Sequence, residues 1–161
     1  MLLLVTIVAI HGCGVYSFTG ASIDPNVSSF SVRTLVNQAP LVVPTLSQDL
    51  TEALRLKFIT NTNLRQKETG GDLEFSGFIS NYQVSPVAPQ ADEVAAVNRL
   101  TITVSIEFVN HQNDKQSWTN SFSRYADYDS SKDLASVADQ LIDEIIEQLV
   151  EDIFNKAVVN W

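Results

Sequence analysis

Few side chains in this 161-residue sequence could act as nucleophiles or as acids and bases near neutral pH. There is one cysteine, Cys13, so neither an intrachain disulfide nor a cysteine-based zinc site can form. The two histidines are His11 and His111, and His111 falls in a segment rich in turn-forming residues. A Ser-His-Asp or Cys-His arrangement has almost nothing to build on, and the sequence predicts a protein that is not an enzyme.

Two neighbouring carboxylates, Asp127 and Asp129, raise the question of a site for a hard cation such as Ca²⁺. The stretch around them lacks the glycine and the terminal glutamate of an EF-hand loop. Helix capping and contact with solvent explain these residues better. We therefore predict no metal site and no cofactor.

Four of the ten basic residues lie within thirteen positions, and these are Arg55, Lys57, Arg65 and Lys67. Guanidinium and ammonium groups gathered in this way could pair with lipid phosphates or other anionic groups. The alternative is that they complement the dipole at the end of a helix and form a solvated surface. We treat the four residues as the candidate anion-binding site.

The acidic residues are concentrated in the last third of the chain. The formal net charge is −9, and the stretch from Asp127 to Asp152 contains nine acidic residues and one basic residue, Lys132. A nucleic-acid-binding surface needs lysine and arginine gathered on one face, so nucleic acid is excluded as a partner. The acidic stretch is interpreted as the solvated face of a helix. The alternatives are that it repels an anionic ligand or pairs with basic residues of a partner.

The N-terminal residues 1–12 have the features of a cleaved targeting signal. Residues 1–10 form an uncharged run, apolar except for Thr6, which is about half of the ~20 residues that a membrane-spanning helix needs. This length is typical of the hydrophobic region of a signal peptide. The following Ile10-His11-Gly12-Cys13 resembles the lipobox of bacterial lipoproteins, so we predict removal of residues 1–12 and lipidation of Cys13. The alternative is a buried N-terminal strand with a structural cysteine.

A lipidated Cys13 would anchor the protein without spanning the membrane. Each buried methylene of an acyl chain contributes about 0.8 kcal/mol, so several chains hold a domain stably on a bilayer. Gly14 follows the cysteine, at a position where some sorting systems use an aspartate to retain a lipoprotein in the inner membrane. We therefore expect the periplasmic side of the outer membrane, with residues 13–161 forming one domain around a single core.

The elements that position these residues begin with a strand and a helix. Residues 27–36 alternate with the period of a strand, which places Phe30, Val32, Thr34 and Val36 on one face. Thr45 and Gln48 have the spacing of a capping box that opens a helix. Apolar residues at three- and four-residue spacing predict its buried stripe, which consists of Leu46, Leu50, Ala53, Leu54 and Phe58.

Three further strands follow a polar connection over residues 61–69. Residues 73–84 are predicted to form a strand with a bulge at Ser76-Gly77, because the apolar side chains change parity there and a bulge would bring Phe78 to the buried face. Residues 100–108 alternate most regularly. Residues 117–125 return as the second strand of a hairpin.

The final element is a long amphipathic helix, which Ser130 or Ser131 is predicted to cap. Its apolar stripe consists of Leu134, Val137, Leu141, Ile145, Leu149 and Ile153. The predicted fold class is α+β, a four-stranded sheet with two amphipathic helices packed on one face, in the order β-α-β-β-β-α.

The connection over residues 85–98 contains Pro86 and Pro89 and is long for a compact domain. Long connections on a rigid scaffold often carry contacts. This segment is therefore predicted either to touch a partner or simply to be mobile.

Three segments carry a resemblance to a known family. They are Cys13-Gly-Val-Tyr-Ser-Phe18, the stretch from Asn37-Gln-Ala-Pro40 to Pro44-Thr-Leu-Ser47, and the tail from Glu151-Asp-Ile-Phe-Asn-Lys156 to Trp161. Together with the order of elements after the cysteine, these segments resemble LptE, the lipopolysaccharide-assembly lipoprotein family of Gram-negative outer membranes. The resemblance covers nearly the whole chain.

The resemblance implies a function in assembly. Members of this family sit inside, and help to assemble, the large β-barrel translocon LptD, and they bind lipopolysaccharide on its way to the outer leaflet. The partners implied are an LptD-like barrel, lipopolysaccharide, and the membrane through Cys13. The four basic residues are then candidate contacts for lipopolysaccharide on the ground of their charge.

A second class of function is a lipid-anchored periplasmic carrier that binds an amphiphile in a pocket. A carrier would bind lipid alone, whereas an assembly factor would co-purify with its barrel. The sequence favours the assembly factor, because two helix stripes and one sheet face account for its apolar residues and leave little for a lipid cavity.

Overall fold

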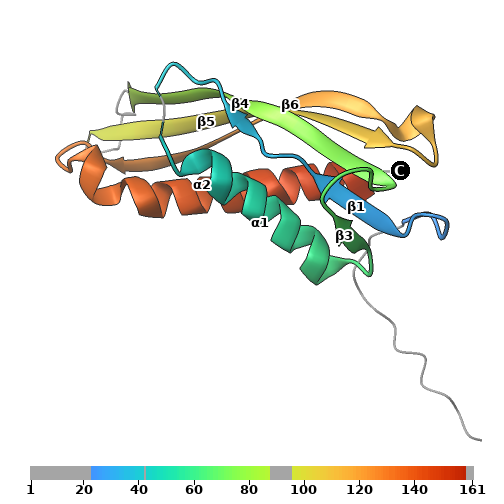
Figure 1. Ribbon diagram of the computed structural model, residues 1–161. Helices are drawn as coiled ribbons and strands as arrows, with labels where there is room; N and C mark the ends of the chain where they lie inside the picture. The colour runs from blue at the N-terminus through green and yellow to red at the C-terminus, as the bar shows by residue number, and fades with distance from the viewer. Residues whose placement is uncertain (1–22, 42, 88–95, 159–161) are drawn as a thin grey trace, which may run out of the picture.

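The computed structural model describes residues 23–41, 43–87 and 96–158, so the predicted signal peptide and Cys13 lie outside the described residues. Figure 1 shows two layers, a sheet above and two helices beneath it, α1 (Leu46–Asn61) and α2 (Leu134–Val158). Both helices cover the same face of the sheet, as their apolar stripes require. The predicted α+β class and the placement of the helices are confirmed.

The sheet contains six strands rather than the predicted four. Its order is β3-β1-β4-β5-β6, with β2 alongside β4. The strands are β1 (Ser29–Val32), β2 (Val36–Asn37), β3 (Arg65–Lys67), β4 (Leu73–Val87), β5 (Val97–Asn110) and β6 (Trp118–Asp129). β1 pairs in parallel with β3 and β4, whereas β4, β5 and β6 form an antiparallel meander.

The predicted strand over residues 27–36 is broken at Leu35, which separates β1 from β2. Leu35 turns into the core and is fully buried. Its N–H donates to Thr51 Oγ1 (3.0 Å) and its carbonyl accepts from Ser47 Oγ (2.6 Å), so two hydroxyls of α1 replace strand neighbours. The alternation fails beyond β1, and Val36, which the pattern places inward, is 54% exposed.

The other additional strand, β3, lies within the segment that the sequence predicts to be a polar connection. Its three side chains are exposed, so no apolar period marks it. Parallel pairing with β1 holds it in place, together with the N–H of Arg65, which donates to the carbonyl of Ser28 (3.0 Å).

The bulge in β4 falls at Ser80 and not at Ser76-Gly77. The register with β5 shifts at this point, and the Ser80 hydroxyl donates to the carbonyl of Thr103 (3.2 Å). Phe78 therefore lies on the outer face of the sheet and is only half-buried, contrary to the prediction. The side chain of the extra residue thus supplies a hydrogen bond across the irregularity.

The predicted caps are wrong at both helices, although α1 begins directly after Thr45 as expected. Thr45 has a helical backbone conformation, and its side chain makes no capping bond. The carboxylate of Asp133 accepts from the N–H of Ala135 (3.2 Å) at the start of α2. The N–H of Ser131 instead donates to Asp129 in the preceding turn.

Phe58 of α1 lies at the centre of the core and touches both layers. Its ring centroid is 5.3 Å from that of Phe30 in β1, 4.8 Å from Phe75 in β4 and 5.0 Å from Phe154 in α2. The aromatic contacts continue into β5 through Phe108, 4.9 Å from Phe75. Pairs of this kind add about 0.5 to 1.5 kcal/mol each beyond the burial of their surface.

Gly77 marks a close approach of β4 to β5. Its φ is 155°, and a Cβ at this position would lie 2.1 Å from the carbonyl oxygen of Ser105. Two strands that are hydrogen-bonded on both sides of this point cannot separate locally without loss of their ladder. The glycine at this position of the strand is therefore required for steric reasons.

We expect Gly77→Ala to lower the free energy of unfolding by about 3 kcal/mol or more, because the added methyl group overlaps backbone atoms of β5. Gly70→Ala is the matched control. Its φ is 66°, but no heavy atom of the described residues lies within 4 Å of the added Cβ, so only backbone strain of about 1 to 2 kcal/mol is expected. Urea unfolding of both variants measures the difference, and equal losses would contradict the steric explanation.

Candidate functional site

The carboxylate of Asp72 gathers hydrogen bonds at the end of the sheet where the chain enters β1. Oδ2 accepts from the N–H and the hydroxyl of Ser28 (2.9 and 3.0 Å) and from the N–H and the hydroxyl of Ser29 (3.0 and 2.9 Å). Oδ1 accepts from the side chain of Gln112 (3.2 Å). One side chain thus joins the start of β1, the turn before β4 and the turn after β5.

These hydrogen bonds favour the ionised form of Asp72. The backbone N–H of Ser28, followed by the hydroxyl of Ser29, holds the pKa of Asp72 well below its usual value of 3.8, while partial burial opposes the shift. A carboxylate that accepts several hydrogen bonds is stabilised in its charged form. Asp72 is therefore ionised across the neutral and mildly acidic range.

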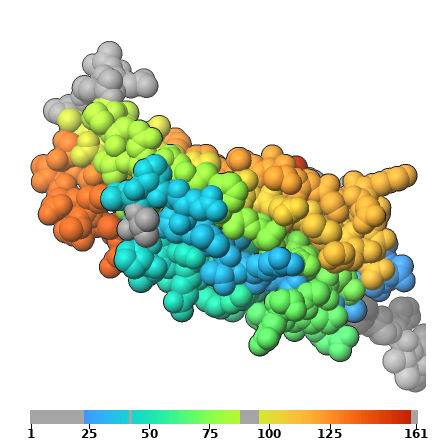
Figure 2. Space-filling view, turned by 45° about the horizontal axis from the view of Figure 1, so that its top comes forward, coloured from blue at the N-terminus to red at the C-terminus, as the bar shows by residue number. Residues whose placement is uncertain are grey.

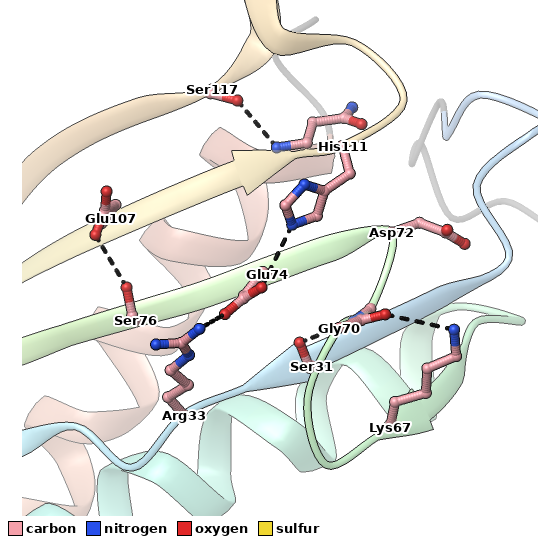
Figure 3. A network of polar contacts seen from close by, with 12 residues as sticks. Ser31, Arg33, Lys67, Gly70, Asp72, Glu74, Ser76, Glu107, His111 and Ser117 are labelled. Atoms are coloured by element: carbon pink, nitrogen blue, oxygen red, sulfur yellow. Dashed lines mark hydrogen bonds and ion pairs between the residues drawn. The ribbon is translucent and has the colours of Figure 1, made fainter.

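Glu74 lies next to this site on the outer face of the sheet, between two basic groups (Figure 3). Its oxygens are 2.5 Å from Nη2 of Arg33 and 3.3 Å from Nε2 of His111. The side chain of Glu74 is 13% exposed, whereas those of Arg33 and His111 are 61% and 50% exposed. The His111 ring is thus oriented by a carboxylate, while the Ser117 hydroxyl nearby accepts from the N–H of Asn110.

The structure divides the four predicted basic residues into two pairs. Arg55 donates to Glu52 (2.5 Å) and to the carbonyl of Val32 (2.8 Å), so it joins α1 to β1. Lys57 forms an ion pair with Glu151 and thereby joins α1 to α2. The hydrogen bond from Lys57 lowers the pKa of Glu151. Both cations of α1 are engaged within the fold.

Arg65 and Lys67, by contrast, lie on the exposed edge strand β3. Lys67 donates to the carbonyl of Gly70 at 3.4 Å, and among the described residues neither cation forms an ion pair. Lys67 is paired with Ser31 of β1, two residues before Arg33 (Figure 3). Of the four predicted cations, the two that remain available to an external anion therefore lie together on β3.

The carboxylates Asp127 and Asp129 serve the fold. Arg99 donates to both oxygens of Asp127 (2.7 and 2.8 Å), and this lowers the pKa of Asp127. The guanidinium of Arg99 also lies 3.6 Å above the ring of Tyr125. Within residues 23–41, 43–87 and 96–158, no three His, Cys, Asp or Glu side chains are grouped in a way that could hold a metal ion.

A groove of about 420 Å³ runs between α1 and α2 on the side away from the sheet. Its apolar lining is formed by Ala53, Leu56, Ile146 and Val150. Acidic side chains border it, namely Asp49, Asp143, Glu147 and Glu151. Leu56 is 62% exposed, so the groove is an open surface feature rather than an enclosed pocket.

The opposite face of the molecule, the outer face of the sheet, is rich in hydroxyl groups. Strands β5 and β6 present alternate residues there, including Thr101, Thr103, Ser105, Thr119, Ser121 and Ser123. The Thr103 and Ser123 hydroxyls are hydrogen-bonded to each other across the strands (2.9 Å). Neither described helix combines the length and the apolar character needed to cross a membrane.

The model of one protein family, LptE (lipopolysaccharide-assembly), matches residues 27–157. The chain belongs to the LptE family. The matched region begins two residues before β1 and ends within the last turn of α2, so it contains every strand of the sheet. No curated protein matches this LptE-family chain significantly.

Solved structures share the fold of this LptE-family chain at low sequence identity. A protein from Xanthomonas campestris has a TM-score of 0.56 at 13% identity, with 84% of this chain and 89% of that chain covered. A minor lipoprotein from Acinetobacter baumannii has a TM-score of 0.52 at 14% identity, with 83% and 94% covered. A putative neuraminyllactose-binding hemagglutinin homolog from Helicobacter pylori has a TM-score of 0.51 at 11% identity, with 88% of each covered.

Sequence reasoning missed Asp72 and Glu74, which organise this end of the LptE-family domain. The available signal was the Gly70-Gly71 pair directly before Asp72, because a tight turn followed by a carboxylate often supplies local hydrogen bonds. The partners Ser28 and Ser29 are more than forty positions away and could not be named from the pattern.

We expect Asp72→Asn to lower the free energy of unfolding by about 1 to 3 kcal/mol at pH 7, because the neutral amide offers the four donors of Ser28 and Ser29 no negative charge and is a weaker acceptor. The contribution of Asp72 is fully present above the unfolded pKa of about 3.9. It is lost as the pH falls through the lowered folded pKa. The difference in stability between wild type and Asp72→Asn should therefore shrink below about pH 4.

Denaturant unfolding between pH 7 and pH 2.5 measures this difference. Asp139→Asn is the control, since Asp139 is an exposed carboxylate of α2. It should change stability by less than about 0.5 kcal/mol at pH 7. A difference for Asp72→Asn that stays constant as the pH falls would contradict an electrostatic origin.

Proposed function

We propose that this LptE-family chain is a non-catalytic lipoprotein component of the outer-membrane lipopolysaccharide translocon. It is anchored at Cys13 on the periplasmic side, and it assists assembly of an LptD-like β-barrel and plugs it. The observation that carries the proposal is the family match over residues 27–157, which spans the two-layer core. Two parts of the proposal, the lipid anchor and the association with a β-barrel, rest on the family and on the sequence resemblance.

The polarity of the outer sheet face supports the plug. The interior of a transmembrane β-barrel is polar and hydrated, so a domain placed inside it needs surfaces that remain soluble. The hydroxyl groups of β5 and β6 form bonds with water or with polar side chains without carrying a charge to be neutralised. Such a face is suited to a polar lumen because its hydroxyl groups carry no charge that must be neutralised. Glu107, which also lies on this face, accepts from the hydroxyl of Ser76 (3.2 Å).

The exposed cations of β3 support contact with lipopolysaccharide. Arg65 and Lys67 offer donors to phosphate oxygens, and an arginine can bind two oxygens at once. Arg55 and Lys57 are less suited to this role because their partners are Glu52 and Glu151. We therefore assign the lipopolysaccharide phosphates to the β3 pair.

A lipid-anchored periplasmic carrier is the second candidate, and the groove between α1 and α2 is the observation that favours it. An acyl chain could lie along Leu56 and Val150. The acidic border of the groove repels anionic head groups, however, so the groove is poorly matched to lipid A. The assembly function is accordingly the better supported of the two.

Affinity purification of the tagged protein from its native outer membrane in mild detergent tests the proposed function. Mass spectrometry should identify a large β-barrel in about equal amount and an acylated Cys13 in the N-terminal peptide. Cys13→Ser should abolish acylation and release the protein from the membrane fraction. An acylated protein recovered with bound lipid and no barrel would instead support the carrier.

We expect the double variant Arg65→Glu, Lys67→Glu to bind lipopolysaccharide about tenfold more weakly or worse, which corresponds to about 1.4 kcal/mol. Lys67→Glu alone should have an intermediate effect, and Lys132→Glu is its matched control on an exposed turn elsewhere. Titration of labelled lipopolysaccharide against each purified variant gives the affinities. Unchanged binding by the double variant would remove β3 from the site.

A further inference from the structure

The two edges of the sheet differ in their protection against pairing with another strand. β3 forms one edge and β6 the other. β3 has three residues, two of them cations, and short charged edges resist added strands. β6 has twelve residues and contains neither proline nor lysine, and its pairing with β5 shows no register shift. β6 therefore lacks the usual devices that block strand addition.

The register of β6 shows which of its backbone groups point away from β5. The N–H of Ser130 donates to the carbonyl of Ala96 (3.0 Å), which makes Val97 and Asp129 a non-hydrogen-bonded pair. Because the pattern alternates, the even-numbered residues of β6 bond to β5. The N–H and C=O groups of the odd-numbered residues point to the free edge, and these residues are Thr119, Ser121, Ser123, Tyr125 and Asp127.

These outward groups are open to a partner. All five odd-numbered side chains are exposed, and within the described residues no backbone donor or acceptor meets their N–H and C=O groups. In Figure 2 the yellow and orange surface of β5 and β6 occupies the upper right of the molecule, and no other element lies over it in this view. The green surface of β3 lies at the lower margin.

The charged side chains of β6 do not guard this edge, because the fold already engages them. Arg124 donates to both oxygens of Asp152 in α2 (2.6 Å each). Asp127 is held by Arg99 and Asp129 by the N–H of Ser131. An incoming strand therefore meets two paired charges and, at the end of β6, the carboxylate of Asp129, which accepts from a neutral N–H.

The negative charge of the domain selects the kind of partner. The formal net charge of the chain is −9, and α2, which lies against β6, carries six carboxylates and one lysine. Asp152 is paired with Arg124, and Asp143, Glu147 and Glu151 line the groove beside α1, so the preference comes from the net charge and not from a row of carboxylates along β6. A second copy joined through β6 would bring two such helices together, and their like charges would oppose the pairing. A segment with basic side chains would instead be attracted by the net negative charge of the domain.

We infer that β6 is a docking edge that accepts an extended, basic segment of a partner protein as an additional strand of the sheet. This inference rests on the proposed function in that the partner is the protein with which the chain is assembled in the outer membrane. Main-chain hydrogen bonds to the odd-numbered residues supply affinity, and the net negative charge of the domain supplies preference.

Residue-resolved hydrogen–deuterium exchange tests the docking edge on the full-length protein. Outer-membrane vesicles that contain the tagged protein are labelled intact, and the protein is then recovered for mass spectrometry. The same protein purified alone in detergent is the reference. The N–H groups of Ser121, Ser123 and Tyr125 should exchange at least about tenfold more slowly in the vesicles than in the purified protein.

Ser121→Pro and Ser121→Ala form a matched pair of variants, and the measurement is how much of the partner co-purifies with each. Proline removes the outward N–H and is tolerated on an edge strand, whereas alanine keeps the N–H and removes the hydroxyl. Ser121→Pro should reduce co-purification of the partner several-fold, and Ser121→Ala should not. Slow exchange at the even-numbered residues verifies that β6 still pairs with β5. If the proline variant fails this check, Ser121→Lys takes its place and should reduce co-purification by repelling a basic segment.

The outcomes separate this inference from the proposed function. Recovery of the barrel with unslowed exchange at the odd-numbered residues overturns the docking edge and leaves the assembly function standing. Slowed exchange with a partner that is no barrel supports the docking edge and overturns the assembly function. If exchange at the odd-numbered residues slows in the purified protein as its own concentration is raised, a second copy binds at β6. That result overturns the inference. Equal co-purification by the proline and alanine variants also overturns it.

Discussion

The contact of Phe58 with β1, β4 and α2 is the constraint on which the two-layer arrangement depends. α1 packs against the short strands β1, β2 and β3, whereas α2 packs against β5 and β6, and the two helices meet each other. A single ring at this junction fixes their separation, because protein interiors are close-packed and a smaller side chain would leave a cavity. The position of β1, and with it the Asp72 site, follows from this junction.

Elements with a periodic apolar face could be predicted from the sequence. β5 and both helices bury the side chains that their periods select, such as Ile102, Leu54 and Ile145. β3 could not be predicted, because an exposed edge strand has no apolar period. The break at Leu35 was hidden for another reason, since it depends on the hydroxyl of Thr51, sixteen positions further along the chain. An alternating pattern predicts which side chains of a strand are buried. It does not predict a break caused by a side chain that bonds to a distant backbone group.

The charged residues, too, could be predicted only in part from the sequence. Their types indicated an anion site and an acidic helix face, but their partners depend on the fold. Lys57 and Glu151 are 94 positions apart, and their ion pair removes one predicted cation from the site and one carboxylate from the solvated face. The acidic surface of α2 is consequently smaller than the sequence suggests, and the two predicted cations that form no ion pair among the described residues lie on β3.

Tension applied to the chain at residue 23 reaches the fold through Ser28 and Ser29. The turn that ends at Val27 has one backbone bond and yields first. Beyond it, β1 lies between β3 and β4, and Asp72 holds its first residue and the residue before it. A pull along the axis of β1 therefore shears both ladders and the carboxylate bonds at once instead of peeling them singly. The point at which the described chain enters β1 is thereby mechanically firm.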